Sequence, residues 1–219
     1  MKIVMTPAAK VVPAVLTADT AELARLVALA NRFARYVQVD FMDGVFVPSH
    51  SVSVADMCAL EVRFQWEAHL MVVDPIAYLQ SLHAAGAARV IFHVESCPQP
   101  LEVALAARSL GLGVGLALNP PTPVHEVQEL LPAMDSVLLM TVYPGYYGAP
   151  FVPEVMSKVA QVRAACEHIE VGVDGGVKEA NMPEVLRHGV DTVCVGSAVF
   201  SSADPEASYL RLTALARQA

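Results

Sequence analysis

The feature that most constrains this chain is a series of eight short apolar runs spread along its 219 residues. The runs are rich in Val, Ile and Leu and nearly continuous, which is typical of strands buried on both faces of a parallel sheet. They span residues 11–16, 36–41, 65–72, 89–94, 113–118, 136–142, 169–173 and 192–195.

Helical patterns lie between these runs. In residues 21–33, the apolar residues Leu23, Leu26, Val27 and Ala30 recur at helical spacing. Further helices are predicted at 76–85, 101–110, 184–188 and 206–217, each close behind a proline. Eight strand–helix alternations in one chain predict a single (β/α)8 TIM barrel domain over residues 1–219, with a doubly wound open sheet as the second candidate.

Composition excludes several other classes of protein. Charged residues make up 16% of the chain and hydrophobic residues 55%, which argues against intrinsic disorder. The net charge of −8, without a basic cluster, argues against nucleic-acid binding. No apolar run approaches the roughly 18 residues of a membrane span, and the first residues lack a secretory pattern, so we expect a cytoplasmic protein.

Polar residues end the predicted strands. Because TIM barrels carry their active sites at the carboxyl ends of the strands, these residues predict an active site at that rim. They are Thr17, Gln38, Asp40, His69, His93, Glu95, Asn119, Thr141, Asp174 and Ser197.

Two kinds of motif stand out at this rim. Gln38 and Asp40 are two apart on a strand and so share a face, and a carboxylate at the end of an apolar strand is costly unless it is paired or binds something. Gly175-Gly176 and Gly196-Ser197 follow the last two strands, where such barrels often bind phosphate, although ordinary turns use the same residues. The loop 143–151 carries four aromatic residues and is predicted to be a binding loop or lid.

At this point the sequence resembles the ribulose-phosphate 3-epimerase family. The Met-Asp-Gly-x-Phe-Val-Pro block at 42–48 is the most specific match, and the family's other motifs follow in its order along nearly the whole chain. The matching segments are 12–19, 39–48, 69–72, 118–120, 139–145, 173–177 and 195–200.

The resemblance implies a (β/α)8 barrel that inverts the carbon next to the carbonyl of a phosphorylated ketose. By the family's pattern, Asp40 and Asp174 are the catalytic acid and base on opposite faces of the substrate, and they bind a divalent metal ion (Zn, Mn, Fe or Mg) together with His69. The residues that the resemblance assigns to substrate binding are Thr17, Met42, His69, Met71, Met140, Gly145, Gly148, Gly175, Gly176, Gly196 and Ser197.

The sequence departs from the family at three places. Gln38 replaces the family's other histidine ligand, so we expect weaker binding of zinc, with Gln38 as an oxygen ligand or a hydrogen-bonding neighbour. Thr17 replaces a serine and keeps its hydroxyl group. In the phosphate loop, Tyr147 replaces a glycine and Ala149 a glutamine, which suggests a differently shaped substrate or a displaced phosphate.

Two other functions remain open. The first is a non-catalytic sugar-phosphate-binding relative, although a binding protein needs no acid–base pair. The second is a decarboxylase or aldolase type of barrel, which would use a lysine near Asp40, but the chain has no lysine between Arg35 and Lys158. We expect a phosphorylated ketose as substrate, no nucleic acid or membrane partner, and a homo-oligomer.

Overall fold

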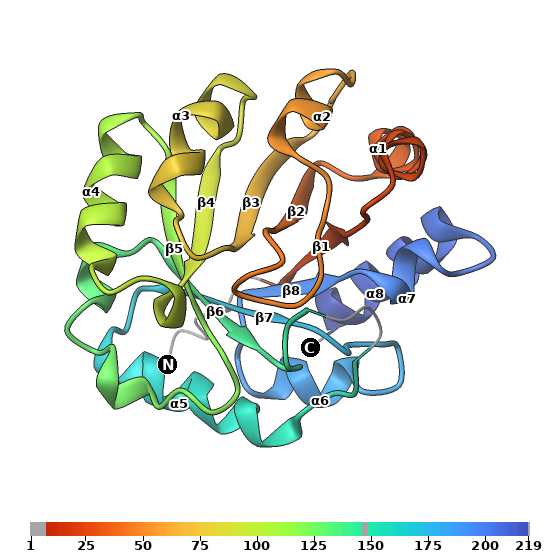
Figure 1. Ribbon diagram of the computed structural model, residues 1–219. Coiled ribbons are helices and arrows are strands. Elements are labelled where there is room, and N and C mark those ends of the chain that lie inside the picture. The colour runs from red at the N-terminus through yellow and green to blue at the C-terminus, as the bar shows by residue number, and fades with distance from the viewer. Residues whose placement is uncertain (1–7, 146–148, 219) are drawn as a thin grey trace.

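The computed structural model describes residues 8–145 and 149–218, which form a closed barrel of eight parallel strands in chain order (Figure 1). The closed barrel confirms the predicted fold and rules out the open sheet. The strands are β1 (Lys10–Val15), β2 (Tyr36–Met42), β3 (Gln65–Met71), β4 (Arg89–His93), β5 (Gly113–Leu118), β6 (Ser136–Met140), β7 (Glu170–Asp174) and β8 (Thr192–Val195).

All eight predicted runs form strands, and their ends differ from the prediction by at most two residues. The difference matters most at β7, which ends on Asp174 itself. This carboxylate therefore belongs to the strand and is held by its backbone pairing with Met140 of β6 and Cys194 of β8.

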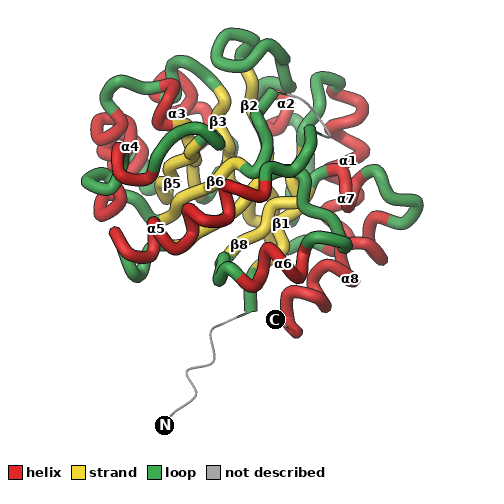
Figure 2. The backbone as a smooth tube through the Cα atoms, turned by 90° about the horizontal axis from the view of Figure 1, so that it is seen from below, coloured by secondary structure: helices red, strands yellow, loops and turns green. Residues whose placement is uncertain are grey.

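The helices lie outside the strands, as Figures 1 and 2 both show. The first helix begins after Asp19, whose side chain accepts a hydrogen bond from the backbone of Glu22 at 2.8 Å, a typical N-cap. The helices are α1 (Thr20–Phe33), α2 (Val54–Cys58), α3 (Ile76–Ala84), α4 (Pro100–Ser109), α5 (Ser157–Ala165), α6 (Met182–Arg187), α7 (Ser197–Phe200) and α8 (Pro205–Gln218).

The connection between β5 and β6 departs from the expected alternation. It contains only two 3-10 helices, η2 (Val124–Glu126) and η3 (Leu131–Ala133), so the expectation of a helical pattern after every strand was wrong here. Four of its residues are prolines, which remove backbone donors that an α-helix needs. Two other 3-10 helices, η1 (Val94–Ser96) and η4 (Pro153–Met156), follow β4 and precede α5.

The apolar core has two layers. The larger one fills the space between the barrel and the surrounding helices and includes Trp66, Phe41 and Phe92. The smaller one lies within the barrel and includes Ile91, Leu138 and Met140. A Cβ atom at Gly115 would lie 2.6 Å from the hydroxyl oxygen of Ser136, so this interior position has no room for a side chain. The rigid inner layer supports the residues at both ends of the barrel.

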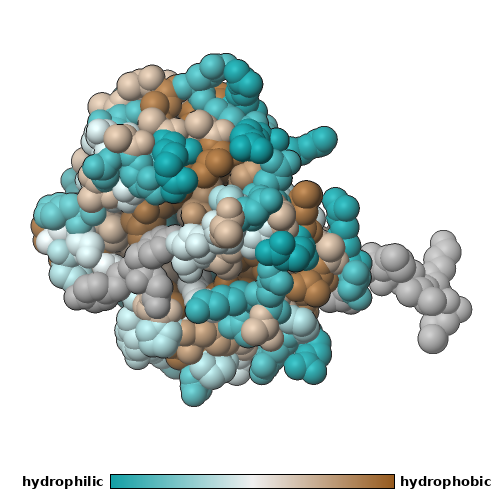
Figure 3. Space-filling model, turned by 90° about the vertical axis from the view of Figure 1, so that its right-hand side faces the viewer, coloured by the Kyte–Doolittle hydropathy of each residue, from teal (hydrophilic) through white to brown (hydrophobic). Residues whose placement is uncertain are grey.

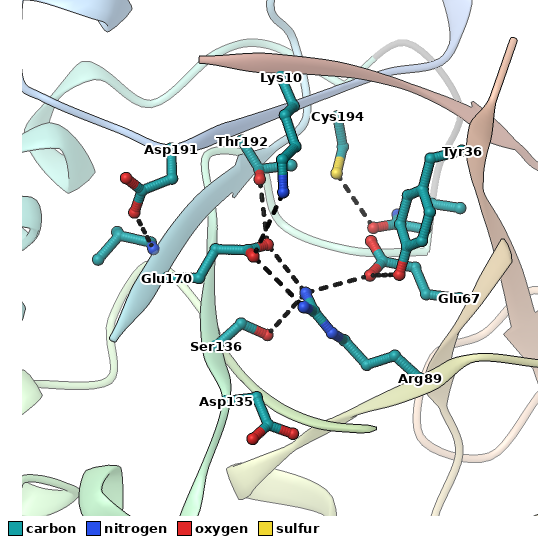
Figure 4. A network of polar contacts seen from close by, with 12 residues as sticks. Lys10, Tyr36, Glu67, Arg89, Asp135, Ser136, Glu170, Asp191, Thr192 and Cys194 are labelled. Carbon is teal, nitrogen blue, oxygen red and sulfur yellow. Dashed lines mark hydrogen bonds and ion pairs between the residues drawn. The ribbon is translucent and has the colours of Figure 1, made fainter. Parts of the chain in front are cut away.

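A polar network closes the amino-terminal end of the barrel. Arg89 lies at its centre, and Figure 4 shows its guanidinium between Glu67, Ser136 and Glu170. The shortest of these contacts joins Arg89 Nη1 to Glu170 Oε1 at 2.9 Å, and Tyr36 donates to Glu67 at 2.9 Å. Lys10 lies 3.9 Å from Glu170, so two cations face two carboxylates at this end.

The outer surface mixes residue types. On the face shown in Figure 3, brown apolar patches are separated by teal polar ones. Within residues 8–145 and 149–218, none of the helices combines the length and the apolar character that crossing a membrane would require.

Candidate active site

Three of the predicted site residues converge at the carboxyl ends of the strands. Asp40 on β2 and His69 on β3 are direct neighbours in the parallel register, and Asp174 ends β7. All three side chains are buried: their residues expose 6%, 0% and 8% of their surface. Burial of two carboxylates at the end of a barrel is costly unless the site holds a proton, a cation or a substrate.

The geometry of these three residues fits a divalent metal ion. His69 Nδ1 lies 3.0 Å from Asp40 Oδ1 and 3.6 Å from Asp174 Oδ2. One ligand atom from each residue lies within 4.8 Å of the others. Ligands that bind one ion at about 2.0–2.2 Å are separated by comparable distances, so Asp40, His69 and Asp174 could hold a metal ion.

Gln38 lies beneath the two carboxylates and is fully buried. Its Nε2 donates to Asp40 Oδ1 at 2.9 Å and to Asp174 Oδ2 at 2.7 Å. Its Oε1 faces Cys194 of β8, whose thiol donates to it at 3.1 Å. The amide therefore turns its nitrogen toward the carboxylates. Of the two roles predicted for Gln38, this orientation agrees with the hydrogen-bonding neighbour and not with the oxygen ligand.

The electrostatics of the site set Asp174 apart from an ordinary surface carboxylate. Burial, together with the negative charge of Asp40, raises the pKa of Asp174 to about 6. Burial lowers the pKa of His69, but the hydrogen bond and charge of Asp40 and the charge of Asp174 outweigh it, so the net shift is upward. A carboxyl group that takes up a proton near neutral pH beside a second carboxylate is suited to acid–base catalysis.

A second histidine, His93, contacts His69 on the side of its ring that faces away from the carboxylates. His93 Nε2 lies 2.9 Å from His69 Nε2, and His93 Nδ1 lies 3.2 Å from Glu95 Oε2. Burial is the main cause of a lowered pKa of His93, to about 4. His93 and Glu95 were both predicted to lie at the rim. No pattern in the sequence showed that His93 contacts His69 or that Glu95 contacts His93.

A cavity opens above the carboxylates. Among the predicted residues it is lined by Asp40, His69, Met71, Met140, Gly145, Asp174, Gly175, Gly176, Gly196 and Ser197. Two other lining residues, Pro144 and Ala149, belong to the predicted binding loop. The remaining ones, Ala14, Leu16 and Val142, were not singled out as site residues, because small and apolar side chains carry no chemical signal of their own.

Two described residues that were predicted to bind substrate are not part of this lining. Thr17 and Met42 line an adjoining cavity that shares Ala14, Leu16 and Gly145 with the first. The Thr17 hydroxyl accepts a hydrogen bond from the backbone of Asp19 at 3.0 Å, and so stabilises the start of α1. Gly148 and its neighbour Tyr147 lie outside the described residues.

The turn after β7 requires glycine. Gly175 and Gly176 have φ angles of +109° and +68°, which residues with side chains rarely adopt. A Cβ atom at Gly175 would also lie 2.4 Å from the side chain of Val142. The hydroxyl of Thr141 fixes this turn by donating to the backbone oxygens of Asp174 and Gly175, so the backbone is exposed to the cavity in one conformation.

The fold and the site together define a (β/α)8 barrel enzyme with a buried pair of carboxylates and a histidine at the catalytic end. Comparison with known proteins identifies its family. Residues 10–200 match the model of the ribulose-phosphate 3 epimerase family. The chain is similar to the ribulose-phosphate 3-epimerase of Mycobacterium bovis, with 36% identity over 95% of this chain and 92% of that protein.

Two further comparisons agree. The cytoplasmic isoform of ribulose-phosphate 3-epimerase from Oryza sativa is 35% identical, with 90% of each chain covered. The crystal structure of a 3-hexulose-6-phosphate synthase shares the fold, with a TM-score of 0.72 and 19% identity over 94% of this chain and 99% of that one. The chain belongs to the ribulose-phosphate 3-epimerase family, and its class is that of the isomerases acting on carbohydrates.

Proposed function

We propose that this protein epimerises a phosphorylated ketose at the carbon next to its carbonyl group, with D-ribulose 5-phosphate and D-xylulose 5-phosphate as the default pair. The observation that carries the proposal is the pair Asp40 and Asp174, buried on different strands beneath one cavity. Inversion of a carbon needs a base on one side of the substrate and an acid on the other.

The roles of acid and base are assigned to the two carboxylates by which of them holds a proton. Asp174, whose pKa is raised to about 6, is the group that more readily holds a proton, and Asp40 is then the base. Asp40 removes the proton from the substrate carbon to leave an enediolate, and Asp174 returns a proton on the opposite face. The roles reverse in the other direction, because the reaction interconverts two epimers.

The surroundings of the pair support this chemistry. Met71 and Met140 line the same cavity and are almost fully buried, so they give it an apolar wall. Their polarizable thioethers suit contact with a planar, electron-rich intermediate.

A divalent metal ion would be held by Asp40, His69 and Asp174. When bound, it would stabilise negative charge on the substrate oxygens as a Lewis acid. Zinc, manganese, iron and magnesium all remain candidates. Gln38 holds the two carboxylates in place through its amide nitrogen.

The phosphate group of the substrate is proposed to bind the backbone amides that follow Gly175-Gly176 and Gly196-Ser197. These residues line the cavity on the side away from His69's strand, and the positive φ angles of the first pair expose backbone rather than side chain. Backbone N–H groups bind phosphate without a net positive charge, which suits a chain of net charge −8. Residues 146–148 of the loop predicted to be a lid lie outside the described residues.

The experiment that tests the function is exchange of substrate hydrogen with D2O. The protein is incubated with D-ribulose 5-phosphate, another pentulose phosphate, a tetrulose phosphate and a hexulose phosphate, and NMR follows both deuterium incorporation and the epimer formed. Rapid incorporation at the carbon next to the carbonyl, with the inverted product, supports the proposal. A protein that binds one of these sugars but exchanges no hydrogen would instead be the non-catalytic relative.

A further inference from the structure

His93 and Glu95 form a chain of contacts that ends on the predicted metal ligand His69. His93 lies at the end of β4, and Glu95 lies in η1 directly behind it. His69 Nε2 and His93 Nε2 are 2.9 Å apart, and His93 Nδ1 and Glu95 Oε2 are 3.2 Å apart. The other nitrogen of His69, Nδ1, faces Asp40 and Asp174.

The donors and acceptors in this chain fix its direction. A carboxylate only accepts hydrogen bonds, so Glu95 takes the hydrogen of His93 Nδ1. His93 Nε2 is then bare and accepts from His69 Nε2. With one hydrogen on Nε2, His69 has Nδ1 free for the site: without an ion this nitrogen donates a second hydrogen to Asp40 at 3.0 Å, and a divalent ion would take the place of that hydrogen.

We propose that Glu95 and His93 are positioning residues that keep the hydrogen of His69 on Nε2 and so reserve Nδ1 for a divalent metal ion. The proposal rests on the metal site described under the proposed function. It assigns the two residues a role that neither the acid–base pair nor the phosphate site requires. Histidines that bind metals commonly have their second nitrogen fixed by such a partner.

Glu95 is itself held in one orientation. Its Oε1 accepts a hydrogen bond from the backbone of Asn119 at 2.8 Å and another from the hydroxyl of Thr122. Lys158 holds that segment by donating to the backbone oxygens of Asn119, Pro120 and Thr122 at 3.0, 2.7 and 2.6 Å. Only Oε2 is left to face His93.

The rings are also fixed by packing. His69 and His93 are fully buried and lie nearly parallel, with ring centres 5.1 Å apart. Phe46, from the loop after β2, packs against His93 with ring centres 4.9 Å apart. Bulk water therefore does not compete for the nitrogens, and their protein partners decide which of them carries a hydrogen.

The test measures the hydrogens directly. Long-range ¹H–¹⁵N NMR spectra of the ¹⁵N-labelled protein, with and without zinc, distinguish protonated from bare imidazole nitrogens. We expect a hydrogen on His69 Nε2 and on His93 Nδ1, and none on His93 Nε2. A hydrogen on His93 Nε2 would overturn the proposal without any variant.

The variant Glu95→Gln is designed to reverse the direction of the hydrogen bonds that link residue 95, His93 and His69. Its amide oxygen would stay with the two donors at Asn119 and Thr122, so its NH2 group would face His93 Nδ1. The hydrogen of His93 would then move to Nε2 and force that of His69 onto Nδ1. We expect zinc affinity, measured by competition with a chelator, to fall about 10–100-fold.

The matched control is Glu129→Gln, the same chemical change at an exposed residue, which should keep wild-type affinity. In Glu95→Gln, a lower zinc affinity without movement of the hydrogens, or moved hydrogens with unchanged affinity, would each refute the proposal. If the wild-type protein binds no zinc or manganese at all, the proposed metal site fails instead. The hydrogen positions in the metal-free protein would then support or refute the chain independently.

Discussion

The barrel contains a polar network at each end, and the two differ in how their charges are balanced. At the amino-terminal end, Arg89 and Lys10 face Glu67 and Glu170, so the charges are paired. At the carboxyl end, the ion pairs of Asp40 and Asp174 among the described residues involve only His69.

The difference is the one expected between a network that serves stability and a network that serves the proposed chemistry. Paired charges with satisfied hydrogen bonds need nothing from outside, and their disruption costs stability. Two carboxylates with a single histidine between them leave negative charge uncompensated, and this charge can be offset by a proton, a metal ion or a polarised substrate. The same fold thus carries a structural network and a reactive one about one barrel length apart.

The largest expected effect is at the reactive end. Asp40→Asn and Asp174→Asn should each lower epimerisation by about 10²–10⁴-fold or more, because loss of one acid or base usually costs that much and inversion needs both. Turnover is measured by product formation, and folding by circular dichroism. Near-normal turnover in either variant would contradict the two-carboxylate mechanism.

A substitution in the charge-paired network at the amino-terminal end should lower stability and leave turnover nearly unchanged. Arg89→Met leaves Glu67 and Glu170 without their main cation, and we expect the free energy of unfolding to fall by about 2–4 kcal/mol. Denaturant unfolding measures this loss, while kcat at a temperature where the variant is folded should change less than about threefold. Arg63→Met, which breaks an exposed pair with Glu61, is the control and should cost less than about 1 kcal/mol. A large loss of kcat in Arg89→Met would show that the two ends are coupled.

The pH dependence of stability sharpens the comparison. Burial is the main cause of a raised pKa of Glu67, about 7 against an ordinary 4.5, although Arg89 opposes it. Because the folded protein holds this proton more tightly, the contribution of Glu67 to stability is complete below pH 4.5 and is lost as the pH rises to 7.

Glu67→Gln should therefore remove part of this pH dependence. The unfolding free energy of the wild type, relative to the variant, should fall by about 1–3 kcal/mol between pH 4.5 and pH 7.5. Other titrating groups are present in both proteins and largely cancel in the difference. A difference that stays constant with pH would mean that folding does not raise the pKa of Glu67.

The strands and the two buried carboxylates at their ends were predictable from the sequence because both depend on local patterns. Continuous apolar runs define buried strands, and a carboxylate at the end of such a run, as at Asp40 and Asp174, stands out against its neighbours. The short helix α2 left only a weak signal, the capping pair Ser53 and Asp56 before an ordinary sequence.

The contacts that orient the site were not predictable, because they join residues far apart in the chain. The amide of Gln38 is turned by Cys194, 156 residues away, and nothing in either residue's neighbourhood indicates this partner. His93 was placed at the rim, but its contact with His69 depends on how β3 and β4 pack with Phe46 above them. Such orientations are properties of the closed barrel and not of its segments.

The smallest and most selective expected effect concerns Gln38. Its amide nitrogen donates to the same two carboxylate oxygens, Asp40 Oδ1 and Asp174 Oδ2, that would bind a metal ion. Gln38→His removes this donor and adds a nitrogen with a lone pair, so zinc or manganese should bind about tenfold more tightly or better. Competition with a chelator measures the affinity.

Gln38→Leu separates the two causes, because it removes the donor without adding a ligand. If Gln38→His binds metal more tightly than both the wild type and Gln38→Leu, the new imidazole is a ligand and the wild-type site is a weakened form of a two-histidine site. Unchanged affinity in Gln38→His, with full wild-type activity after exhaustive chelation, would contradict that interpretation. In that case the amide of Gln38 replaces the metal ion between the carboxylates. Because both of its hydrogens are used there, other donors such as His69 and Thr17 would have to stabilise the enediolate. The charge of the two carboxylates would then be offset by a donor from the protein itself, the Gln38 amide. In this respect the carboxyl end would resemble the network at the amino-terminal end, where Arg89 offsets the charge of the carboxylates.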